Sequence, residues 1–61
     1  MKAYDRMGNE LYRGTTVHLL GHSMTVAGTG DITGFTKDGH VVVNLGKCKR
    51  TVHPYDTLKD M

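Results

Sequence analysis

The chain has 61 residues, which suffices for one domain and excludes a second, so residues 1–61 are expected to fold as a unit. Eight glycines, one proline and the absence of a long helical periodicity favour an all-β fold. The formal net charge of +2 permits contact with nucleic acid without requiring it, and no apolar run approaches the roughly 20 residues of a membrane span.

The first segment, residues 1–13, is expected to form a short ordered arm with a turn at residues 7–10. No hydrophobic stretch follows Lys2, so a secretion signal is not expected. Cys48 is the single cysteine, which excludes an intrachain disulfide and is typical of a reducing compartment. These features predict a cytoplasmic protein.

Residues 15–20 alternate between polar and apolar side chains, as expected of a strand that is buried on one face. Val17 and Leu19 would lie on the buried face. A turn is expected at residues 21–23, where Gly21 begins a polar break in the pattern.

The next extended segment, residues 24–35, contains Gly28, Gly30 and Gly34, with Ile32 as its expected core residue. Glycine inside a strand marks a bulge, a bend or a close backbone approach, and a small curled sheet needs such points. These glycines do not form a phosphate-binding loop, because no helix follows whose N-terminus could hold the anion. They are therefore expected to bend the sheet.

Asp38-Gly39 predicts a tight hairpin turn of type I′, in which both central residues have positive φ. Residues 40–45 would form the return strand. Three of its residues are expected to face the core: Val41, Val43 and Leu45.

A turn at residues 46–47 leads to a strand over residues 48–53 with Val52 toward the core. This strand ends at Pro54, which cannot donate a ladder hydrogen bond. The segment that begins at Pro54 suits a single 3₁₀ turn over residues 54–57. Leu58 begins a short last strand, which we expect to pair with the first one.

This order of elements resembles a five-stranded SH3-like barrel with a 3₁₀ turn before the last strand. Residues 8–17 are similar to the G-x-x-L-x-x-G-D-x-V opening of small SH3-like and KOW-type domains, and residues 28–32 to their G-x-G-x-V segment. Residues 50–58 look like their closing segment. The chain departs from the pattern at Thr15, where Asp is common, and it lacks the aromatic groove of SH3 domains, so proline-rich peptides are not expected ligands.

The resemblance covers nearly the whole chain, but its motifs encode bends and turns and so specify fold more than function. KOW-type barrels contact RNA, DNA, ribosomes or RNA polymerase, which implies nucleic acid or a nucleic-acid-processing machine as the partner. The size and style of the chain are also similar to small accessory proteins of bacteria or bacteriophages.

A basic cluster follows the hairpin. Lys47 and Lys49 would share one face of a strand by alternation and could line a phosphate backbone, with Arg50 beside them. Lys37 at the other turn adds charge, and Tyr55 offers a ring for base stacking. Further candidates are Tyr12 and Phe35 for stacking and Arg13 for a phosphate contact. The alternative interpretation is that these cations protect a sheet edge from aggregation.

The potential metal ligands lack the spacing of a zinc site; they are His18, His22, His40, His53 and Cys48. A catalytic cysteine would need a nearby histidine, such as His40, and an orienting carboxylate, whereas a lone Cys48 is usually a packing residue. The carboxylates form no spaced acid–base pair. No metal, no cofactor and no enzymatic activity are therefore expected.

A second hypothesis is a protein-interaction or inhibitor module that docks an edge strand, or the face containing Val42, on a larger machine. A third is self-association through an open sheet edge. All three hypotheses share one expectation, a small all-β binding module without a membrane segment.

Overall fold

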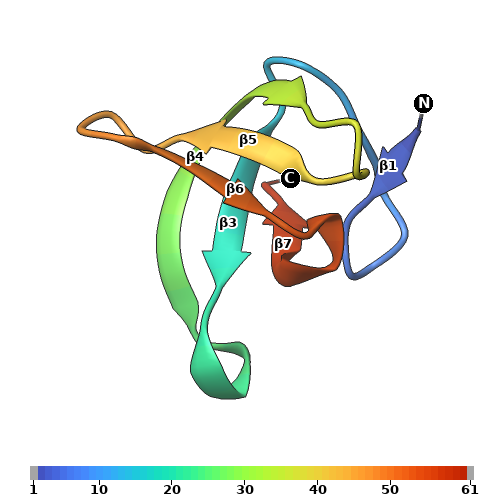
Figure 1. Ribbon diagram of the computed structural model, residues 1–61. Helices are drawn as coiled ribbons and strands as arrows, with labels where there is room; N and C mark the ends of the chain where they lie inside the picture. The colour runs from blue at the N-terminus through green and yellow to red at the C-terminus, as the bar shows by residue number, and fades with distance from the viewer. Residues whose placement is uncertain (1, 61) are drawn as a thin grey trace.

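The computed structural model describes residues 2–60, except for the side chain of Met24 (Figure 1). Its elements in chain order are β1 (Ala3–Tyr4), β2 (Glu10–Leu11), β3 (Thr16–Leu20), the 3₁₀ turn η1 (His22–Met24), β4 (Val26–Phe35), β5 (Val41–Asn44), β6 (Lys49–Val52), the 3₁₀ turn η2 (Pro54–Asp56) and β7 (Thr57–Lys59). The all-β prediction is confirmed, as is the 3₁₀ turn before the last strand.

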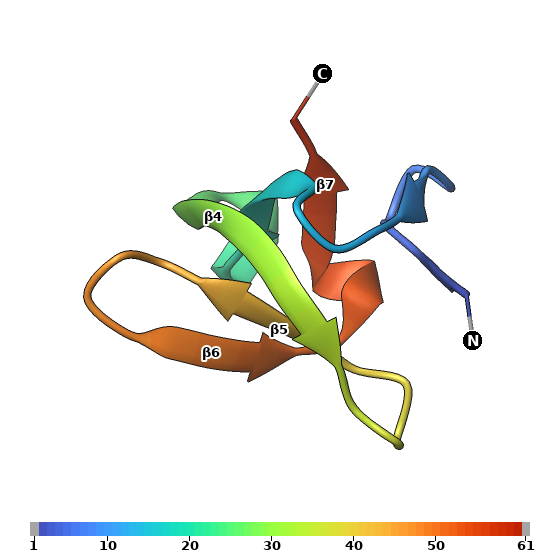
Figure 2. The same cartoon turned by 90° about the horizontal axis from the view of Figure 1, so that it is seen from above.

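Five strands form one antiparallel sheet in the order β6-β5-β4-β3-β7, and β1 and β2 form a separate hairpin (Figures 1 and 2). The predicted pairing of the last strand with the strand at residues 16–20 is confirmed. The sheet has β6 and β7 as its two edges and is not closed into the predicted barrel. The β1–β2 hairpin lies beside β7 instead, where the Arg6 amide donates to the Thr57 carbonyl at 3.0 Å.

Apolar side chains on one face of this sheet form the core, with Ala3 and Leu11 added from the β1–β2 hairpin. The core residues expected from alternation are less than 5% exposed: Val17, Leu19, Ile32, Val41 and Val43. Two other expected core residues, Leu45 and Val52, are only partly buried and pack against the core from its margin. Burying a side chain of this size contributes about 1.5–3 kcal/mol.

The long strand β4 is bent by two irregularities in its pairing. Leu19 pairs with Gly28 while Leu20 pairs with Val26, so Ala27 is an extra residue. On the other side, Ile32 pairs with Val43 while Gly34 pairs with Val42, so Thr33 is extra. Both bulges adjoin glycines that the sequence marked as bends.

Gly30 allows a close approach of two strands, because a Cβ atom there would collide with the backbone carbonyl of Asn44.

The strand β4 begins at Val26 and not at Met24, since the chain first makes the turn η1. Ser23 within this turn has φ of 58°.

The β4–β5 turn is not of the predicted type I′. Gly39 has φ of +84°, but Asp38 does not adopt positive φ. The Gly39 amide donates to the Thr36 carbonyl at 3.1 Å and the Thr36 amide to the His40 carbonyl at 2.9 Å. This is the three-residue connection in which a glycine follows a type I turn.

Candidate nucleic-acid interface

The tip of the β5–β6 hairpin carries the main basic cluster. Asn44 pairs with Lys49, and the Leu45 amide donates to the Cys48 carbonyl at 2.8 Å, which closes the turn. Gly46 provides the left-handed residue with φ of +94°, and its amide donates to Asn44 Oδ1 at 2.9 Å. This turn places Lys47 at the exposed end of the hairpin.

The three cations of this tip point in different directions. Lys47 lies in the turn and not in the strand, so the prediction that strand alternation aligns it with Lys49 is wrong. Arg50 pairs with buried Val43. It therefore lies on the same side of the sheet as the core, but outside the core itself. Lys49 and its partner Asn44 lie on the opposite, outer side.

Lys37 lies far from this cluster along the sheet. It belongs to the β4–β5 turn, which Figure 2 shows at the other end of β5 from the β5–β6 turn. Tyr55 lies in η2, beyond the C-terminal end of β6, and is 53% exposed. The structure thus brings Lys47, Lys49 and Arg50 together at one tip but leaves Lys37 and Tyr55 outside it.

The three candidate stacking residues differ in exposure. Phe35 is partly buried and packs against the core, so it exposes less of its ring than the two tyrosines do. Tyr12 is 56% exposed, and its hydroxyl donates to Glu10 Oε1 at 2.9 Å. This hydrogen bond and the neighbouring carboxylate raise the pKa of Tyr12 above its usual value near 10. The Arg6 guanidinium lies over the Tyr55 ring, 4.1 Å from its centroid.

The histidines and the cysteine do not converge. The rings of His40 and His53 meet edge to face with centroids 5.5 Å apart. Cys48 is exposed at the opposite end of the hairpin, so the suggestion that folding brings it to His40 is wrong. Within residues 2–60, no group of three or more His, Cys, Asp or Glu side chains could hold a metal ion, and no pocket opens on the surface.

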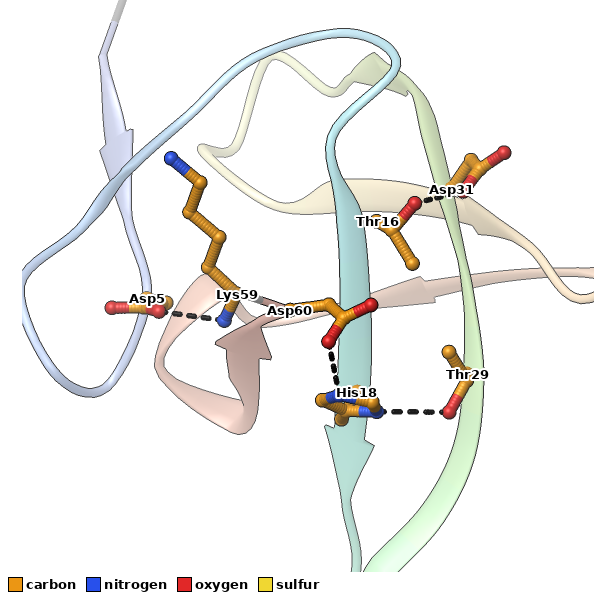
Figure 3. Close-up of polar contacts among 7 residues, drawn as sticks. All are labelled: Asp5, Thr16, His18, Thr29, Asp31, Lys59 and Asp60. Carbon is orange, nitrogen blue, oxygen red and sulfur yellow. Dashed lines mark hydrogen bonds and ion pairs between the residues drawn. The ribbon is translucent and has the colours of Figure 1, made fainter.

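The outer face of the sheet carries a polar network that sequence reasoning missed. His18 Nδ1 lies 2.9 Å from Thr29 Oγ1 and His18 Nε2 lies 3.3 Å from Asp60 Oδ1, so one ring links β3, β4 and the residue after β7 (Figure 3). Beside it, the Thr16 hydroxyl donates to Asp31 at 2.7 Å. Alternation alone places His18 on this face, but its partners come from other strands.

Asp5 was also missed as a structural residue. It is only 3% exposed, and its carboxylate accepts hydrogen bonds from the amides of Met7, Asn9 and Lys59 at 2.7–2.9 Å. Figure 3 shows the bond to the Lys59 amide, which ties the β1–β2 hairpin to β7. The spacing from Asp5 to Met7 is that of an Asx turn, a local signal that could have identified this role.

Comparisons with known proteins leave the family open. Scans against protein-family models, curated proteins and solved structures gave no significant match. Over the residues that the structure describes, no helix is both long and apolar enough to cross a bilayer.

Proposed function

We propose that this protein is a non-enzymatic binding module that contacts nucleic acid through the tip of its β5–β6 hairpin. The observation that carries the proposal is the unneutralised charge of Lys47, Lys49 and Arg50. All three are exposed, and the only ion pair among residues 2–60 joins His18 and Asp60. Three exposed cations within four residues give this tip a local positive charge that can neutralise the phosphates of a nucleic acid.

The three directions of these side chains suit a backbone that runs across the tip. Lys47 extends from the turn, while Lys49 and Arg50 lie on opposite sides of the same edge strand. Cations on both sides of a narrow hairpin can contact successive phosphates without any base-specific contact. The proposal therefore includes affinity for nucleic acid with little dependence on sequence.

The relationship to SH3-like, KOW-type barrels is part of the same proposal. The order of the strands and the 3₁₀ turn η2 before β7 support it. A cytoplasmic location is proposed as well, because the exposed thiol of Cys48 suits a reducing compartment.

The salt dependence of binding tests the hairpin. Affinity for a fluorescent oligonucleotide, measured by anisotropy, should fall with salt with a log–log slope of about −2 to −3 for three phosphate contacts. The double variant Lys47→Ala/Lys49→Ala should lower the magnitude of this slope by about 1.4–1.8. Lys37→Ala is the matched control and should leave the slope unchanged. Absence of binding at low salt, or an affinity that does not change with salt concentration, would refute the proposal.

A second candidate is a protein partner that adds a strand to β6 or docks on the outer face of the sheet, where Val42 of β5 lies between the buried residues Val41 and Val43. The strand β6 is an edge of the sheet, and its residues Lys49, Arg50 and Thr51 are exposed. An exposed edge offers unpaired backbone groups to another strand, including that of a second copy. This candidate is favoured if a protein partner is still captured after nuclease treatment and by the Lys47→Ala/Lys49→Ala variant, but is not captured by Val42→Ala. Sedimentation as a dimer at micromolar concentration would instead indicate self-pairing.

A further inference from the structure

The exposed aromatic residues gather on one part of the molecule. Tyr4 and Tyr12 on the β1–β2 hairpin are 48% and 56% exposed, and Tyr55 in η2 is 53% exposed. The strand β1 lies against η2, so the hairpin and this turn form neighbouring parts of one surface. We call Tyr4, Tyr12 and Tyr55 the tyrosine surface. It contains every tyrosine of the chain, which has no tryptophan.

Polar contacts hold two of these rings, those of Tyr12 and Tyr55. Glu10, whose backbone pairs with that of Tyr4 across the hairpin, accepts the hydroxyl of Tyr12. Tyr55 is capped on one face by the guanidinium of Arg6. Rings that are ordered before binding lose little conformational entropy when a ligand stacks on them.

The hairpin beneath these rings is also fixed. Asp5 is turned inward, where its carboxylate is saturated by amide donors from the hairpin and from β7. Its negative charge is therefore not presented on the tyrosine surface. Tyr4, which precedes Asp5, is exposed, and Arg6, which follows it, is half-buried.

The charges around the tyrosine surface favour an anionic ligand. Lys2, Arg6 and Arg13 have no ion-pair partner among the residues that the structure describes. Glu10, which accepts the hydroxyl of Tyr12, and Asp56 are the carboxylates beside the rings, so these three cations outnumber them. The Arg6 Nε atom is buried without an acceptor, and the guanidinium lies over the Tyr55 ring.

We propose that the tyrosine surface is a stacking platform for single-stranded nucleic acid. Unpaired bases present flat faces that stack on tyrosine rings, and their phosphates reach the neighbouring cations. A duplex keeps its base faces covered and can use only the charges. The inference rests on the proposed function in that nucleic acid is the ligand, and it adds that the strand is single.

The intrinsic fluorescence of the protein tests this directly, because all of it comes from the three tyrosines of this surface. Titration with an oligothymidylate of about 12 nucleotides, within the site sizes of small β domains, should quench this fluorescence. Tyr4→Ala and Tyr55→Ala should each weaken binding by about 5- to 150-fold, the equivalent of one lost stacking contact. Tyr55→Phe should retain the affinity for the oligothymidylate. In Tyr4→Ala and Tyr55→Ala, the affinity for a duplex of the same length should change less than twofold.

Two controls separate folding from binding. Each variant is first checked by circular dichroism and thermal unfolding, and Tyr4→Ala supports the test if Tyr55→Ala does not fold. The variant Lys47→Ala/Lys49→Ala is titrated in parallel. Binding that is lost in this variant while the tyrosine fluorescence never changes would overturn the inference and leave the hairpin proposal standing.

The converse result separates the two proposals in the other direction. Quenching that depends on Tyr4 and Tyr55 but not on Lys47 or Lys49 would support the tyrosine surface and refute the hairpin. Equal loss of duplex and single-strand affinity in Tyr4→Ala would also overturn the inference, because a stacking contact cannot form with a duplex. Absence of any binding at low salt would refute both.

Discussion

Replacing Asp5 with alanine is expected to remove much of the stability of this domain. The carboxylate accepts three backbone amides, from Met7 at 2.9 Å, Asn9 at 2.8 Å and Lys59 at 2.7 Å. A buried donor that loses its acceptor costs about 1–3 kcal/mol, so the three together cost about 3–6 kcal/mol once some of them rebind water. A domain of this length has a free energy of unfolding of about 3–9 kcal/mol.

Urea denaturation measures this effect, with Asp60→Ala as the matched control. Asp60 is an exposed carboxylate whose side chain pairs with His18, so its loss should cost less than about 1 kcal/mol. Asp5→Asn keeps the shape and one acceptor oxygen, but it points an amide toward the Lys59 amide, so it should fall between the wild type and Asp5→Ala. A loss below about 1 kcal/mol in Asp5→Ala would refute the view that these bonds hold the hairpin to the sheet.

The same carboxylate predicts a pH dependence. Burial alone would raise the pKa of Asp5, but the hydrogen bonds from Lys59, Asn9 and Met7 outweigh it and lower the pKa below its ordinary value of 3.8. The folded state thus binds this proton more weakly than the unfolded state does. Its stabilisation is complete above the unfolded pKa and is lost as the pH falls through the lower, folded value. The gap in unfolding free energy between wild type and Asp5→Asn should therefore shrink in acid, and a constant gap would contradict this assignment.

Two further predictions concern β4 and the tyrosine surface. Gly30→Ala should destabilise by about 3 kcal/mol or more in urea denaturation, because its Cβ meets the sheet backbone, whereas Gly34→Ala, with open space around it, should change stability by less than about 1 kcal/mol; equal effects would contradict the close approach. Glu10→Gln should bring the pKa of Tyr12 down toward its ordinary value, seen as an earlier rise of tyrosinate absorbance near 295 nm, and an unchanged titration would show that the hydrogen bond does not form in solution.

Much of the sheet could be predicted because its signals are local. Alternation at Val17 and Leu19, and at Val41 and Val43, marks the buried face within a few residues of chain. Pro54 marks the 3₁₀ turn for an equally local reason, since proline has no amide to donate to a ladder. The predicted type of the β4–β5 turn was wrong, because the Asp38-Gly39 dipeptide is compatible with more than one connection and the chain forms the three-residue one.

The candidate sites depended on where each strand begins and which strands adjoin. Because β6 begins at Lys49, Lys47 lies in the turn, and Arg50 lies on the opposite face of the sheet from Lys49. A shift of the strand register by one residue would have exchanged the faces of Lys49 and Arg50. Lys37 was grouped with this cluster by its position in a neighbouring turn, but the length of β5 separates the two turns. Periodicity could not show this, because it does not determine exact strand ends.

The sequence by itself determined an all-β chain, the buried face of its central strands and the glycines at which it bends. Only the tertiary structure decided that Asp5 is a buried link to Lys59, 54 residues later, and that Tyr55 lies under Arg6 beside the N-terminal hairpin. The physical reason is that alternation and turn chemistry act over a few neighbouring residues. Contacts between distant segments depend on the sheet order and on the closing of the β1–β2 hairpin against β7.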